Sequence, residues 1–313
     1  MASYYNNDTI IFSNGEFVKA AEAKMDLYSQ SLHYGYSVFE GIRSYKTVNS
    51  QTKIFKEVEH FERLKNSAAA LNMPYHWNTE ELIDATYEVL KRNNLGDAYI
   101  RPVVYAPANM KFDVNEKSFI VIEAWEMQPF LGEKLLRVMT SSFQRPNPKG
   151  FKIHAKAAGH YVNSLLASHE AKANGFDEAL LLDMNDYVAE APGANIFYEK
   201  DVKLFTPALG NILPGIKRAT VLEICNELNL PSGRQGIEVE EKFFTLEELK
   251  NADAAFFCGT AAEVIGFESL DDYKFPLNWN DSVSRKIQLA YKDRVIEKEL
   301  LPRKHGFTRK EFA

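Results

Sequence analysis

The chain has 313 residues, a length that corresponds to about two domains of ordinary size. Its 45% hydrophobic and 26% charged residues are typical of a globular protein. The 37 Lys and Arg residues are outnumbered by 43 Asp and Glu residues, which gives a net charge of −6, and no block of like charge stands out. This balance argues against nucleic acid or an anionic membrane as a partner.

The first residues and the cysteines of the sequence favour a cytoplasmic location. The first residues are polar and lack the apolar segment of a secretory signal, and no apolar run approaches the length of a bilayer span. The only cysteines, Cys225 and Cys258, form no C-x-x-C pair, and two cysteines alone cannot make a structural zinc site. We therefore expect a cytoplasmic protein without a metal site.

The first 126 residues predict a smaller domain of strands and two helices. Asn14-Gly15 between apolar residues predicts a hairpin over residues 9–19. Apolar residues at helical spacing predict a helix over 59–71, with Arg63 off its apolar stripe. Asn78 and Glu81 resemble a capping box that starts a second helix, which ends near residue 94.

Two further segments of this domain combine aromatic and charged residues. Residues 31–45 mix aromatics with glycines, and they either line a pocket or form an aromatic core layer. Residues 98–105 predict a strand with Tyr99 and Arg101 on one face, which suits a carboxylate ligand. Pro102 also allows an exposed edge strand there.

Residues 127–134 break the pattern and predict a linker, followed by a larger domain over residues 135–313. Strands are expected at 135–140, 178–183, 237–240 and 254–258. Helices are expected at 161–173, from 216 to about 228, and from about 282 to 300. A brief helix after Thr245 has Glu248 in the capping-box position.

Lys156 lies among small residues in the segment Ala155-Lys156-Ala157-Ala158-Gly159, just before the helix over 161–173. Burial there disfavours the charged ammonium form. A neutral amine is the nucleophile that forms Schiff bases with carbonyl groups. On the local sequence alone, an ordinary surface lysine remains the commoner explanation.

Three other features suit one ligand together with Lys156. Glu190 ends a strand in the segment Glu190-Ala191-Pro192-Gly193-Ala194-Asn195. The helix that begins at Ile216 offers free N–H groups to a phosphate, and the turn at Thr260 suits an anion. Pyridoxal phosphate requires an amine for its aldehyde, an acid for its ring nitrogen and donors for its phosphate.

With these residues in view, the chain resembles the fold-type IV pyridoxal-phosphate enzymes, and within them the branched-chain amino acid aminotransferases. The resemblance covers residues 12–291. It is carried by five stretches: His33-Tyr34-Gly35 with Ser37-Val38-Phe39-Glu40-Gly41-Ile42-Arg43, Tyr99-Ile100-Arg101-Pro102, Ala155-Lys156-Ala157, Leu213-Pro214-Gly215-Ile216 and Gly259-Thr260-Ala261-Ala262-Glu263.

The resemblance implies an α+β, D-amino acid aminotransferase-like fold with two domains, mixed sheets flanked by helices, and the cofactor between the domains. It implies that Lys156 forms a Schiff base with pyridoxal 5'-phosphate, that Glu190 pairs with the ring nitrogen and that Tyr161 pairs with the phenolic oxygen. The implied phosphate ligands are Arg63, Thr260 and the backbone of Ile216 and Lys217. The implied substrate contacts are Tyr34, Phe39, Tyr99, Arg101, Thr260 and Ala261.

The implied reaction transfers the amino group of leucine, isoleucine or valine to 2-oxoglutarate, giving 2-oxo acids and L-glutamate. The resemblance also implies a homodimer or higher homo-oligomer in which Tyr34 reaches the neighbouring site. Pro192, Met127 and Phe130 differ from the residues usual in the family at these positions. These differences affect the shape of the pocket for the substrate side chain.

Three alternatives stay open. Two are enzymes of the same fold, a D-amino acid aminotransferase and an aminodeoxychorismate lyase. The stretches Phe39-Glu40-Gly41-Ile42-Arg43 and Tyr99-Ile100-Arg101-Pro102 favour the branched-chain interpretation over both. The third is a binding protein without catalysis, against which the presence of Lys156 and Glu190 argues.

Overall fold

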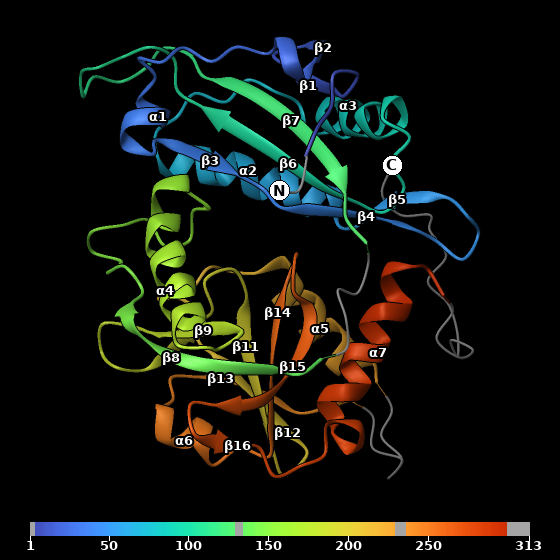
Figure 1. Cartoon of the computed structure of the whole chain (residues 1–313), viewed down its shortest axis with the longest axis vertical. Coiled ribbons are helices and arrows are strands. Elements are labelled where there is room, and N and C mark those ends of the chain that lie inside the picture. Colours follow the sequence, from blue (N-terminus) through green and yellow to red (C-terminus); the bar gives the residue numbers. More distant parts are fainter. Residues whose placement is uncertain (1–3, 129–133, 229–235, 299–313) are drawn as a thin grey trace.

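The computed structural model describes residues 4–128, 134–228 and 236–298. Within this part of the chain, two sheets with their own helices follow one another in the sequence and lie one above the other (Figure 1). The fold is α+β, as the sequence predicts.

The upper half in Figure 1 holds a seven-stranded sheet in the order β2-β1-β7-β6-β4-β5, with β3 also paired to β6. Its strands are β1 (Ile10–Ser13), β2 (Glu16–Lys19), β3 (Ser37–Phe39), β4 (Ile42–Lys46), β5 (Thr52–Ile54), β6 (Ala98–Tyr105) and β7 (Phe119–Glu126). Its helices are α1 (Gln30–Tyr34), α2 (Glu57–Ala70) and α3 (Thr79–Arg92). Phe61 and Leu64 of α2 are fully buried against Ile100 and Ile122 of the sheet, which confirms the predicted apolar stripe.

The lower half holds a nine-stranded sheet in the order β10-β9-β8-β15-β14-β11-β12-β13, with β16 paired to β15. Its strands are β8 (Leu136–Gln144), β9 (Glu178–Leu182), β10 (Val188–Glu190), β11 (Asn195–Lys200), β12 (Lys203–Pro207), β13 (Val239–Lys242), β14 (Ala254–Gly259), β15 (Glu263–Leu270) and β16 (Tyr273–Lys274). Because β10 also pairs with β11, the strands from β10 round to β11 close into a ring.

Four helices surround this ring: α4 (Tyr161–Ala173), α5 (Ile216–Glu227), α6 (Leu246–Lys250) and α7 (Val283–Val295). Figure 1 shows α4 and α7 on opposite sides of the lower half. Val221 of α5 and Ile287 of α7 share a buried core with Tyr45, which comes from β4 of the upper half. No helix in the described part of the chain is long and apolar enough to cross a membrane.

Some element predictions were wrong in detail. The strand predicted over 98–105 is confirmed as β6, but the edge position that Pro102 allowed is wrong, because β6 lies between β7 and β4. Asn78 caps α3 by accepting a hydrogen bond from the backbone N–H of Glu80, so the cap is not the capping box expected with Glu81. At α6 the box between Thr245 and Glu248 is present. The last helix ends at Val295, and residues 299–313 lie outside the described residues.

Candidate active site

A cavity of about 600 Å³, open mouth included, lies where the loop before α4, the β10–β11 turn, the start of α5 and the end of β14 meet. All seven residues that the sequence assigned to the cofactor line it: Arg63, Lys156, Tyr161, Glu190, Ile216, Lys217 and Thr260. Arg63 comes from α2 of the upper half, so both halves of the molecule contribute to the wall.

Lys156 is held at its backbone by the upper half of the molecule. Its N–H donates to the hydroxyl of Ser67 at 3.0 Å, and its carbonyl accepts from the N–H of Phe39 at 3.1 Å. Its side-chain amine donates to the Tyr161 hydroxyl and lies 4.9 Å from the centre of the Phe39 ring. The amine is therefore fixed in the cavity by contacts on both sides.

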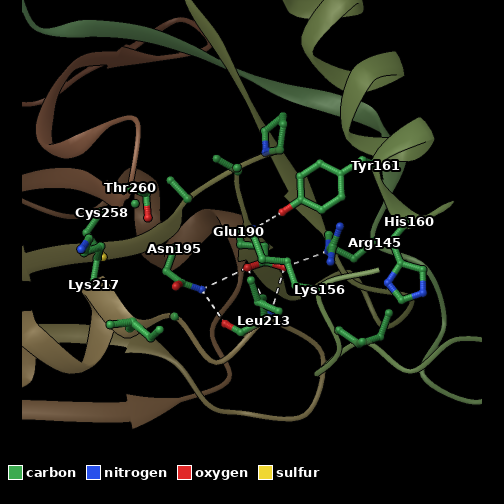
Figure 2. Close-up of a pocket in the computed structure, with 18 of the residues that line it drawn as sticks. Arg145, Lys156, His160, Tyr161, Glu190, Asn195, Leu213, Lys217, Cys258 and Thr260 are labelled. Atoms are coloured by element: carbon green, nitrogen blue, oxygen red, sulfur yellow. Dashed lines mark hydrogen bonds and ion pairs between the residues drawn. The ribbon is translucent and has the colours of Figure 1, made fainter. Parts of the chain in front are cut away.

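Glu190 is 4% exposed and lines the cavity. Its carboxylate accepts from the Asn195 amide at 3.0 Å and from the backbone N–H of Leu213 at 3.1 Å, and Arg145 lies 2.9 Å away (Figure 2). Burial raises the pKa of Glu190, and the nearby Arg145 guanidinium opposes this rise. The result is a buried carboxylate suited to share a proton with a basic ring nitrogen.

Another part of the cavity wall is formed by the start of α5 and by Thr260, which follows β14. Gly215 is the N-cap and supplies no side-chain cap, so the first N–H groups of α5 remain available. A Cβ at Gly215 would lie 1.9 Å from the Asn195 amide oxygen, so only glycine fits at this N-cap. Thr260 donates its hydroxyl to the carbonyl of Gly41 at 2.9 Å.

Arg63 also lines the cavity, and it forms a bidentate ion pair with Glu40. Its Nε and one terminal nitrogen donate to the two Glu40 oxygens at 2.7 and 2.9 Å, and the other terminal nitrogen donates to the Pro214 carbonyl at 3.1 Å. Burial alone would raise the pKa of Glu40, but Arg63 and His60 hold it well below its usual range. Arg63 therefore keeps its charge at the cavity wall and is not a solvated helix residue.

The side chains assigned to the substrate are less uniformly placed. Phe39 contacts both Tyr161, at 4.7 Å between ring centres, and the Arg101 guanidinium, at 4.6 Å from the ring. Arg101 also donates to the Tyr99 hydroxyl at 3.3 Å. Phe39, Arg101 and Tyr99 thus form a chain of contacts that leads from Lys156 to the upper sheet.

Ala261 and Tyr34 lie apart from this group. Ala261 lines a neighbouring cavity. Tyr34 is 46% exposed on α1 and contacts Phe112, so within one chain it lies at the surface.

The sequence did not reveal three partners of the site, namely Arg145, the Asn195 side chain and Glu40. Arg145 precedes a proline in a loop, and Glu40 appeared only within a motif. Arg145 and Glu40 meet their partners across 45 and 23 residues of chain, so local patterns gave no signal for them. Asn195 lies only five residues from Glu190, within the segment already quoted, but its side chain had no role assigned. Met127 is described, but Phe130 lies outside the described residues.

The donor set of the cavity fits pyridoxal phosphate. A buried carboxylate, the N–H groups at the start of α5, and an amine beside a phenol all line it; in Figure 2, Lys217 and Thr260 lie on one side of Glu190, and Lys156 and Tyr161 lie on the other. The buried amine of Lys217 lacks a hydrogen-bond partner among the described residues and adds a basic group to the wall. These groups are the ones that the ring nitrogen, the aldehyde and the phosphate of the cofactor require.

The model of the family "Amino-transferase class IV" matches residues 37–270. The chain belongs to this family. A branched-chain-amino-acid aminotransferase of Pseudomonas aeruginosa is 38% identical over 302 residues, with 95% of this chain and 96% of that protein covered.

Solved structures of branched-chain aminotransferases superpose closely. The enzyme from Thermoproteus uzoniensis with norvaline has a TM-score of 0.87 at 36% identity, over 93% of this chain and 96% of that one. The enzyme from Thermobaculum terrenum in its PLP form has a TM-score of 0.85 at 30% identity, over 94% and 95% of the two chains. The fold is thus that of fold-type IV enzymes, as the resemblance implied.

Proposed function

We propose that this protein is a pyridoxal-phosphate-dependent branched-chain amino acid aminotransferase. It transfers the amino group of leucine, isoleucine or valine to 2-oxoglutarate, and the products are the 2-oxo acids and L-glutamate. The observation that carries the proposal is one cavity that holds the Lys156 amine, the buried Glu190 carboxylate and the N-terminus of α5.

The bound cofactor supplies an electron sink for the bond electrons released at the substrate Cα. The Lys156 amine would bind the aldehyde carbon of the cofactor, and it is the base placed to take the proton from the substrate Cα. Glu190 keeps a proton on the ring nitrogen, and Tyr161 donates to the phenolic oxygen. Arg63, Thr260 and the N–H groups of Ile216 and Lys217 hold the phosphate.

The substrate contacts form the opposite side of the site. Phe39 offers an apolar wall to branched side chains, and Tyr99 and Arg101 complete the pocket. Ala261 lines the neighbouring cavity and follows Thr260, where it would contact the substrate. The Arg101 guanidinium stacks on Phe39 at 4.6 Å, so it can turn toward the second carboxylate of 2-oxoglutarate or glutamate. One pocket then accepts both kinds of substrate.

The division into domains is part of the proposal: residues 1–126 form the smaller domain, 127–134 the linker and 135–313 the larger domain. The separate sheets formed by residues 10–126 and 136–274 support it. A cytoplasmic location is supported by two cysteines that are free and buried in the described structure.

We also infer a homodimer or a higher homo-oligomer. Exposed apolar side chains gather on α1, on the loop over residues 110–114 and on α4, which lie on the same side of the molecule in Figure 1. Among them are Tyr34, Phe112, Val114 and Leu165, of which Phe112 is 90% exposed. Tyr34 of one protomer would then reach the site of its partner.

The test is a spectroscopic titration of the purified protein with pyridoxal phosphate, followed by L-leucine. The protein should turn yellow, L-leucine should bleach the colour and 2-oxoglutarate should restore it. Borohydride should fix the cofactor to the peptide that contains Lys156. Lys156→Ala should bind cofactor through Arg63, Glu190 and α5 but lose turnover by at least ~10²–10⁴-fold.

Native turnover in Lys156→Ala, or label on another lysine, would overturn the assignment. A chiral assay of the amino product tests for a D-amino acid aminotransferase. Release of pyruvate from aminodeoxychorismate would identify the lyase. A protein that stays colourless with cofactor would support a binding protein without catalysis.

A further inference from the structure

Lys217 is the second residue of α5 and is 2% exposed. Among the described residues its amine has no hydrogen-bond partner, and it lies 4.1 Å from the centre of the Phe55 ring. Figure 2 shows the side chain on the cavity wall beside Cys258 and Thr260. Burial of an ammonium group without a partner costs free energy. This amine is therefore expected either to bind an anion or to lose its proton.

The charged and titratable groups around Lys217 largely neutralise one another. They come from the segment after β3, from α2, from β4, from β14 and from β15, and they are Glu40, Arg43, His60, Arg63, Cys258 and Glu263. Glu40 pairs with Arg63 at 2.7 Å, and Glu263 lies 3.6 Å from Arg43. Burial lowers the pKa of His60 to about 4, so this imidazole is neutral at physiological pH.

Burial lowers the pKa of Lys217 to about 7 in the protein without ligand. At pH 8 most of the amine is therefore neutral. A phosphate dianion at the first turn of α5 would place two negative charges beside it and raise this pKa again.

We propose that Lys217 takes up a proton when a phosphate monoester binds at the N-terminus of α5, so that cofactor and proton bind together. The inference rests on the proposed function, because it concerns the phosphate end of the same cavity. It assigns a role to the Lys217 side chain, whereas the proposed phosphate contact uses only its backbone. The affinity of the protein for its cofactor then depends on pH through this one amine.

The experiment is isothermal titration calorimetry at pH 8 in buffers of different ionisation enthalpy, which counts the protons bound with the ligand. Pyridoxamine 5'-phosphate is the probe, since it carries the phosphate but has no aldehyde to react with Lys156. Pyridoxamine, which lacks the phosphate, is the ligand control. The variants are Lys217→Met and, as a matched control, Lys56→Met, whose amine is already paired with Glu59 and Glu223.

The wild type and Lys56→Met should take up close to one proton more per site than Lys217→Met with pyridoxamine 5'-phosphate. That difference should vanish with pyridoxamine. Protons taken up at the ring nitrogen cancel in this comparison. Lys217→Met should also lose affinity at pH 8, about tenfold for each unit by which the pKa of the amine in the complex exceeds 8.

A second measurement needs no variant. The affinity of the wild type for pyridoxamine 5'-phosphate should fall by up to about tenfold per pH unit above pH 7, and that for pyridoxamine should lack this component. Equal proton uptake in wild type and Lys217→Met, or equal pH slopes for both ligands, would overturn the role of Lys217 alone. If pyridoxamine 5'-phosphate does not bind at all, the proposed function fails as well.

Discussion

The pair of Arg145 and Glu190 shows how one residue sets the charge of another inside the protein. Glu190 is buried at the end of β10, and burial raises its pKa. Arg145, 8% exposed and 2.9 Å away, opposes that rise. Removal of one partner of a buried pair leaves an uncompensated charge, which costs about 3–5 kcal/mol.

We predict that Arg145→Met destabilises the cofactor-free protein more at pH 8 than at pH 5. A carboxyl group whose pKa is raised in the folded state binds its proton more tightly there than in the unfolded chain. Its cost to stability therefore appears as the pH rises above the ordinary value of 4.5, and the variant should enlarge this cost. The free energy of unfolding from urea titrations at both pH values is the measurement.

The double variant Arg145→Met with Glu190→Gln is the control. It carries no carboxylate at position 190, so it should recover most of the stability lost at pH 8. Equal losses at pH 5 and pH 8 in the single variant would show that Arg145 acts through packing and not through the charge of Glu190.

Among single residues, the sequence predicted those whose role can be inferred from their neighbours in the chain. Lys156 among small residues and Thr260 after a buried strand are such cases. Arg145 was not predicted, because it meets Glu190 only through the fold, across 45 residues of chain. The Lys217 side chain was missed for a similar reason: its surroundings, Phe55 and Glu263, come from elements distant in sequence.

At the scale of elements, the C-terminal end of α1 packs against the turn that follows Lys156. Gly35 caps α1 with a φ of 65°, in the left-handed region that favours glycine. Its carbonyl accepts from the N–H of Gly159 at 3.1 Å, and a side chain at Gly35 would lie 2.8 Å from the Gly159 Cα. The two glycines thus allow close contact between the halves beside Lys156.

We predict that Gly35→Ala lowers kcat by at least about tenfold, because the contact must open and move the segment from Lys156 to Tyr161. Gly15→Ala is the matched control. Gly15 also has a positive φ of 97°, but nothing lies within 4 Å of an added side chain. Both variants carry backbone strain, and only Gly35→Ala adds the clash. Steady-state kinetics gives kcat for both variants, and thermal melts compare their stability. Equal kcat values would contradict the prediction.

Elements with a clear apolar period were predicted well, including α2, α4 and α5. The position of β6 could not be decided from Pro102, since proline usually avoids central strands. The register explains the exception. Phe39 of β3 pairs with Val103 and Ile42 of β4 pairs with Ile100, so Pro102 faces the break between the two strands. There its carbonyl accepts from the N–H of Glu40 and no proline N–H is needed.

At the scale of the whole molecule, the proposed interface makes a prediction about assembly. Leu165 is 57% exposed on α4, within the apolar surface assigned to a second copy of the chain. Leu165→Glu should shift the protein from dimer to monomer, since a buried unpaired charge is unfavourable. Multi-angle light scattering after size exclusion is the measurement.

Leu289→Glu is the matched control for this change. Leu289 is 45% exposed on α7, on the opposite side of the lower half in Figure 1. It should keep the mass of the wild type. If both variants keep that mass, or both lose it, α4 is not the specific interface, and the placement of Tyr34 in a partner's site would fail with it.

The junction of the two halves has a consequence for the order in which the chain folds during synthesis. Buried Arg43 donates to the carbonyls of Met127 and Gln128, and neighbouring Tyr45 donates to Glu263 at 2.5 Å. Tyr45 and Glu263 are 218 residues apart. At ~5–20 residues per second, the ribosome delivers Glu263 roughly 10–40 s after Tyr45. During that interval the Tyr45 hydroxyl in the nascent upper half lacks its Glu263 partner. The final packing around Tyr45 therefore forms only after the second half has emerged.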